Sequence, residues 1–109
     1  MAYDEGLAQR IRELVGDHPA VTERKMFSGL TFRFNGNIAC GVHGEFLIVR
    51  LPADASTAAL TEPGTHTFNP NGQPANGWIL VGPEAYTEDD DLSRWVARGI
   101  EYAETLPPK

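Results

Sequence analysis

Cys40 and His43 have the spacing of two metal ligands, because two residues separate them. A structural zinc ion takes four ligands, and the chain has no second cysteine and no well-spaced histidine pair to complete the set. Nucleophilic chemistry at Cys40 would need a neighbouring base and an electropositive pocket. Cys40 instead alternates with Ile38 and Val42 along an apolar segment, and free cysteine is among the most buried residue types. We therefore expect no metal site and an inert, buried thiol.

Two further polar motifs have structural explanations. The acidic run Glu88–Asp91 lacks the alternating oxygen ligands and the central glycine of a calcium loop. Carboxylates stabilise the positive N-terminal end of a helix, so this run predicts a first helical turn with Thr87 as its N-cap. Ser28 lacks the flanking glycines of a hydrolase nucleophile elbow. We expect no catalytic residue, no cofactor and no enzymatic activity.

The remaining candidates have binding character: three basic residues on predicted strands, an aromatic residue after a long loop, and one apolar row of a strand. These residues are Lys25, Arg33, Arg50, Trp78, Leu47 and Val49. In the last predicted meander strand, Phe46 and Ile48 alternate against Leu47 and Val49, so both sides are apolar. Helices that cover mainly one face would leave an exposed row of the kind that marks a partner or homodimer contact. The alternative is an ordinary solvated sheet face with isolated arginines.

Hydrophobic spacing predicts three helices, because apolar residues recur three and four positions apart in three segments. These helices are expected over residues 4–15, 53–61 and 89–105. Glycine or proline follows each of them closely and supplies the stop. Their inward faces should bring to the core Leu7, Ile11, Leu14, Leu92 and Trp95.

Four short apolar segments with glycine-containing breaks follow the first helix, which predicts a meander of antiparallel strands. The strands are expected over residues 22–27, 30–34, 37–42 and 45–51. Asn35-Gly36 is the strongest turn signal, because both central residues of a type I′ turn need positive φ, and His43-Gly44 is a weaker one. Alternation should direct toward the core Leu30, Phe32, Phe34, Ile38, Cys40 and Val42.

The second half of the chain adds a buried strand over residues 78–81. Residues 65–68 could form an edge strand within the loop 62–77, and a loop of this length is usually functional or mobile. The order helix, four strands, helix, strand, helix predicts a two-layer α+β domain. Its antiparallel meander sheet should carry the helices mainly on one face.

Length and charge limit the class of protein. The 109 residues, 41% hydrophobic and 22% charged, fit a single domain over residues 1–109. A net charge of −6 repels phosphate backbones and anionic lipids, so a nucleic-acid partner is not expected. No apolar run approaches the roughly 20 residues that span a bilayer, and no secretion leader is recognisable. We expect a cytoplasmic protein without membrane contact.

Several motifs occur in a fixed order along the chain: Lys25–Phe32, Asn35–Val42, Phe46–Arg50, Gly77-Trp78 and Asp91–Val96. With them the chain resembles the N-terminal domain of TfoX/Sxy, a bacterial regulator associated with natural competence, from about Tyr3 to Leu106. Ser28 departs from the pattern, because relatives commonly have a glycine there. The resemblance implies a two-layer α+β fold of the secretion-chaperone-like kind. It carries no catalytic residue, and the competence regulators have a separate C-terminal domain, so their role transfers only in part.

These observations predict a non-enzymatic interaction or regulatory module, linked to transcription or competence, that binds a protein partner or a second copy of itself. One alternative is a small-molecule or anion-binding domain, in which Arg50 and Trp78 line a pocket beside the loop 62–77. Another is direct DNA binding through the three basic residues, which the net charge disfavours.

Overall fold

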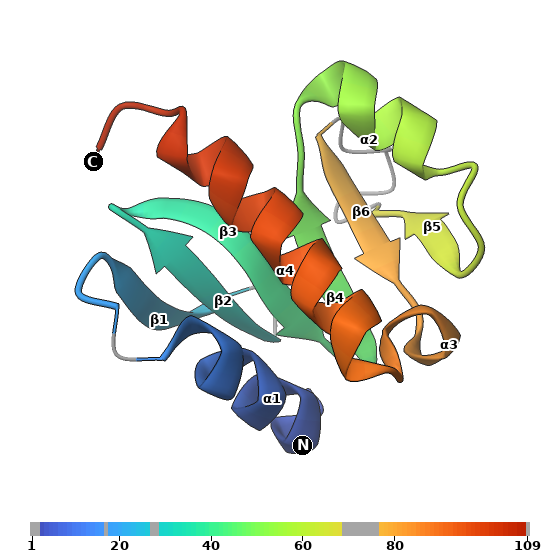
Figure 1. Ribbon diagram of the computed structural model, residues 1–109, viewed down its shortest axis with the longest axis horizontal. Helices are drawn as coiled ribbons and strands as arrows, with labels where there is room; N and C mark the ends of the chain where they lie inside the picture. The colour runs from blue at the N-terminus through green and yellow to red at the C-terminus, as the bar shows by residue number, and fades with distance from the viewer. Residues whose placement is uncertain (1–2, 17, 27–28, 69–76, 109) are drawn as a thin grey trace.

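The computed structural model describes residues 3–16, 18–26, 29–68 and 77–108. In this part of the chain an antiparallel sheet of six strands packs against helices (Figure 1). In chain order the elements are α1 (Glu5–Val15), β1 (Val21–Met26), β2 (Gly29–Phe34), β3 (Asn37–His43), β4 (Phe46–Arg50), α2 (Ala53–Ala59), β5 (Thr65–Thr67), β6 (Trp78–Val81), α3 (Pro83–Tyr86) and α4 (Asp89–Glu104).

The sheet has the strand order β1-β2-β3-β4-β6-β5, and every neighbouring pair is antiparallel. The predicted α+β meander is therefore confirmed, and the three-residue β5 is the predicted edge strand. The remaining part of the long loop, residues 69–76, and the predicted turn at residues 27–28 lie outside the described residues. None of the described helices has the length and hydrophobicity to span a bilayer.

Two hairpin turns show what the glycine signals specify. Asn35 and Gly36 have φ values of 51° and 84°, as the predicted type I′ turn requires. The next turn lies one residue later than expected, at Gly44-Glu45, because His43 still pairs with Phe46. Gly44 has a φ of 59°, a backbone conformation that glycine adopts without steric cost.

α1 and α4 lie across the same face of the sheet in Figure 1. The inner rows of the four central strands meet these helices, and the core on this side includes Leu30, Phe32, Cys40, Val42, Leu47, Val49, Ile79, Val81, Leu7, Ile11, Leu92, Trp95 and Val96. Fully burying an aliphatic or aromatic side chain of this size contributes roughly 1.5–3 kcal/mol, so this layer is the main source of stability.

Strand alternation fails at the start of β3. The pairing register between β2 and β3 shifts directly after Phe32, and a bulge of this kind rotates the neighbouring side chains. Cys40 lies in the core as predicted, but Ile38 is half-buried and its neighbour Ala39 is 2% exposed. Phe34, beyond the bulge, is also only half-buried.

The helices differ from the prediction in two places. Leu14 was expected in the core but is 42% exposed, because the buried face of α1 is centred on Ala8 and Ile11 and Leu14 falls at its margin. Thr87 is not the N-cap of α4. It belongs to the unpredicted α3 turn, where its hydroxyl donates to the carbonyl oxygen of Pro83 at 2.6 Å, and α4 begins after Glu88.

Gly99 allows α4 to approach β3 more closely than any other residue could. A Cβ atom at this position would lie 2.3 Å from the carbonyl oxygen of Ala39, far inside contact distance. The atoms on both sides of this contact belong to the backbone, so a side-chain rotation in α4 or β3 could not relieve the clash. Trp95, one turn earlier, is 2% exposed and fills the space beside the contact.

We expect Gly99→Ala to destabilise the protein by about 1–3 kcal/mol, because overpacking forces α4 away from the sheet. Helix propensity alone predicts the opposite sign, a gain of about 1 kcal/mol. The control is Ala97→Gly on the exposed face of the same helix, which should cost about 1 kcal/mol through propensity. Thermal and urea unfolding measure both variants. A Gly99→Ala protein more stable than wild type would contradict the close approach.

We expect Trp95→Ala to cost about 3–5 kcal/mol of unfolding free energy, because it removes the largest fully buried side chain from the core. That loss would unfold many domains of this size at room temperature. Urea denaturation followed by circular dichroism measures it. An unchanged melting temperature would refute the core position.

Candidate functional site

The structure corrects the predicted roles of Leu47 and Val49. Both side chains are 0% exposed and belong to the core on the helix-covered side of the sheet. The alternation in β4 was predicted correctly, but the row directed away from α1 and α4 is that of Phe46 and Ile48. A partner therefore has no access to Leu47 or Val49 on the surface of the folded domain.

The opposite row of β4 is not an open apolar patch either. Ile48 is 2% exposed and Phe46 is half-buried, with its ring 5.8 Å from that of His66 on the edge strand β5. Phe68 is 5% exposed and has ring contacts with His43 at 5.9 Å and Trp78 at 6.3 Å. Aromatic side chains of the chain itself thus cover this side of the sheet.

The predicted basic residues do not form one patch. Lys25 on the edge strand β1 pairs with Leu30, whereas Arg33 pairs with Thr22 near the other end of the same hairpin. These positions lie three residues apart along β2, which is about 10 Å. Arg50 lies on β4, two strands away from Arg33 in the sheet.

Arg50 and Trp78 are brought together, as a binding role for both would require. They face each other in the β4–β6 pairing, and the guanidinium carbon of Arg50 lies 5.3 Å from the centre of the Trp78 ring. On α4, Tyr102 adds a second ring, 5.6 Å from the same guanidinium carbon. Cation–π contacts of this length hold a guanidinium in place while its N–H groups keep their donor capacity.

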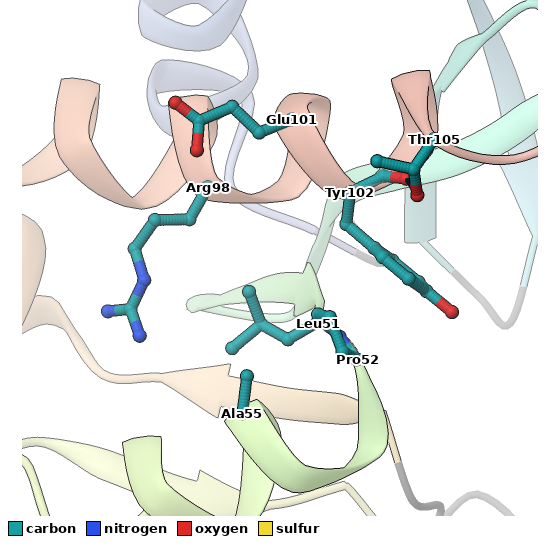
Figure 2. Close-up of a pocket in the computed structure, with 7 residues that line it drawn as sticks. All are labelled: Leu51, Pro52, Ala55, Arg98, Glu101, Tyr102 and Thr105. Carbon is teal, nitrogen blue, oxygen red and sulfur yellow. Dashed lines mark hydrogen bonds between the residues drawn. The ribbon is translucent and has the colours of Figure 1, made fainter.

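A groove of about 380 Å³ opens next to this cluster, between α2 and the C-terminal half of α4. In Figure 2, Arg98 and Tyr102 project from α4 on either side of Leu51. The groove is lined by Leu51, Pro52, Ala55, Arg98, Glu101, Tyr102 and Thr105. Its floor is apolar and its polar groups stand at the rim, which is the usual construction of a ligand site.

A hydrogen bond in the middle of α2 and an ion pair beyond its C-terminal end hold the groove wall that α2 provides. Ser56 accepts a hydrogen bond from the backbone N–H of Gly77 at 3.0 Å, and the carbonyl oxygen of Gly77 accepts one from Leu51 at 2.8 Å. Beyond the C-terminal end of α2, Glu62 forms an ion pair of 3.2 Å with Arg98. Arg98 also lies over the Trp95 ring, with its guanidinium carbon 4.4 Å from the ring centre. The groove is therefore preformed, and the charge of Arg98 is already compensated.

Sequence reasoning missed the groove, although part of its signal is present in the sequence. Arg98, Glu101, Tyr102 and Thr105 recur at three- and four-residue spacing and so share one side of α4. This polar stripe includes one tyrosine, which is a residue with both an apolar body and a polar tip. The other wall comes from α2, and no local pattern indicates which helices become neighbours.

Cys40 and His43 do not converge. Their side chains, three residues apart on β3, alternate to opposite faces of the sheet. Within the described residues, no three His, Cys, Asp or Glu side chains are grouped to hold a metal ion. Burial raises the pKa of the Cys40 thiol to about 12, because the charged thiolate loses its hydration in the core.

We expect Cys40 to resist thiol reagents at pH 8 in the folded protein and to react once the chain unfolds. A thiol with a pKa of about 12 instead of 9.0 holds about a thousandfold less thiolate at this pH, and the core also excludes the reagent. Iodoacetamide labelling followed by mass spectrometry along a urea series should track the unfolding transition. Rapid labelling of the native protein would show that the thiol is accessible.

Comparison with known proteins gives one family. The family model described as the TfoX N-terminal domain matches residues 13–103. No curated protein and no solved structure gives a significant match. The matched segment starts in the last turn of α1 and ends in the last turn of α4, so it contains the whole sheet. It also contains Arg50, Trp78 and every groove residue except Thr105.

Proposed function

Because the chain belongs to the TfoX N-terminal domain family, we propose that it is a non-enzymatic regulatory module that binds a partner protein in the groove between α2 and α4. The family is associated with competence regulation. Regulation of this kind requires specific contacts between proteins, and the groove offers a surface suited to them.

The preformed apolar groove is the observation that carries this proposal. Its floor of Leu51, Pro52 and Ala55 would receive hydrophobic side chains of an extended or helical segment, and its polar rim would fix their orientation. Elsewhere in the described part of the chain, large apolar side chains are buried or half-buried, and Leu14 on α1 is the exposed one. A groove with tethered walls needs little reordering on binding, so more of the contact energy appears as affinity.

Direct DNA binding gains no support from the geometry. Lys25, Arg33 and Arg50 lie on three different strands, and Lys25 lies at a different level of the sheet from the other two. The acidic total, with a net charge of −6, repels phosphate at long range.

We expect Ala55→Arg to lower partner capture about tenfold or more, because the longer side chain fills the groove and a charge enters an apolar contact. Wild-type and variant proteins are immobilised, source-cell lysate is passed over them, and bound proteins are quantified by mass spectrometry. The matched control is Ala58→Arg, which places the same side chain on an exposed position of the same helix.

A specific partner is a protein that is retained by wild type and by Ala58→Arg but lost with Ala55→Arg. Equal melting temperatures of the two variants exclude a folding defect as the cause. If the captured proteins are the same for all three, the groove is not the binding surface.

A further inference from the structure

We propose that Arg50 recognises a carboxylate on the bound partner, so that the groove takes a peptide segment in which Asp or Glu stands beside a hydrophobic residue. This inference rests on the proposed function, because it names the chemistry of the partner for the same groove. Three observations carry it: two rings contact the Arg50 guanidinium, no ion pair to it is formed within the described residues, and one of the rings, Tyr102, also lines the groove.

Two rings from different elements hold the Arg50 side chain. Trp78 on β6 and Tyr102 on α4 lie 5.3 Å and 5.6 Å from its guanidinium carbon, and the residue is half-buried. An aromatic ring stacks on the flat face of a guanidinium, whereas the N–H donors lie in its plane. The donors can therefore still form hydrogen bonds with a ligand. A side chain that is already ordered loses little entropy when it binds, which favours its use in recognition.

Four of the six other arginines have carboxylate partners. Arg10, Arg12, Arg94 and Arg98 form ion pairs of 2.9–3.2 Å with acidic side chains. No hydrogen bond or ion pair within the described residues involves the guanidinium of Arg50, whose contacts there are the two rings. In a chain with 15 acidic and nine basic residues, a half-buried arginine that meets no carboxylate leaves a local positive site.

Tyr102 connects this positive site to the groove, because its ring contacts Arg50 and also lines the groove wall. Arg50 directly precedes Leu51, which forms part of the groove floor. At the rim, Arg98 is paired with Glu62, and the carboxylate of Glu101 would repel an anion. A ligand anion is therefore favoured at the Arg50 end, with a neighbouring apolar side chain over Leu51.

A carboxylate fits this site better than a phosphate. One guanidinium matches the geometry and the single charge of a carboxylate in a bidentate pair. Recognition of phosphorylated peptides generally uses clusters of arginines. The other described basic residue at the groove, Arg98, is occupied by Glu62.

The test selects short peptides from a random displayed library on the wild-type domain and measures the dissociation constants of the selected peptides by fluorescence polarisation. Selected peptides should carry Asp or Glu next to a large apolar residue. Changing that acid to its amide should raise the dissociation constant for wild type about tenfold or more, since charge-assisted pairs are the strong ones. The same change should have no effect on binding to Arg50→Gln.

Arg50→Lys keeps the charge but lacks the planar fork, so it should bind the acidic peptide more weakly than wild type. Arg94→Gln removes an exposed arginine of α4 that does not line the groove and should bind like wild type. Melting curves check that all variants are folded. A phosphorylated version of each peptide, with phosphoserine in place of the acid, is measured in parallel, and tighter binding of that version would overturn the choice of a carboxylate.

The two proposals fail in different ways. If selected peptides bind Arg50→Gln as well as wild type but lose affinity for Ala55→Arg, the groove binds peptides and the role of Arg50 is overturned. If their affinity for Ala55→Arg is also unchanged, or if selection yields no peptide, both the groove and the role of Arg50 are overturned.

Discussion

The close contact between α4 and β3 at Gly99 determines where the rest of the helical layer can lie. Gly99 has no side chain, so the backbone of α4 reaches the Ala39 carbonyl oxygen at a distance that a Cβ atom would prevent. With the helix this close, Trp95 is fully packed on its inner side. Other positions of the same helix line the groove together with α2. Core packing and the candidate site therefore both depend on the position of α4.

The arginines show how an acidic domain distributes its few positive charges. Four of them neutralise carboxylates, and three of these ion pairs join different elements of the fold: Arg10 to Asp89, Arg12 to Glu23 and Arg98 to Glu62. These pairs are largely exposed, so each adds little stability and mainly sets orientation. Arg50 differs because aromatic rings, and not an anion, hold it. Aromatic rings stabilise a cation without neutralising its charge, so the guanidinium of Arg50 can still attract an anionic ligand.

Local sequence signals predicted the elements, and contacts between distant segments produced the misses. Alternation in β4 correctly separated the two apolar rows, but the side on which α4 packs decides which row is buried, and that choice depends on contacts far apart in the chain. Leu14 has the right helical spacing for the core, yet α1 is rotated so that Ala8 and Ile11 face the sheet. The bulge after Phe32 changes which residues of β3 face the core, and no proline or glycine at that position indicates it in the sequence.

The residues of the candidate site also fall into two groups, those that the sequence indicates and those that only the fold brings together. Arg50 and Trp78 were chosen as candidates from their types and strand positions, and antiparallel pairing brings them together. Tyr102 comes from a helix more than 20 residues later, and only the packing of α4 places its ring beside Arg50. Ala55 has no chemical signal at all, because it contributes to the site by being small. A groove made by the spacing of two helices is a property of the fold, whereas the charge proposed to select its ligand is a property of one residue. A substitution at Arg50 would therefore change the charge beside the groove and leave the contact of α4 with β3 at Gly99 as it is.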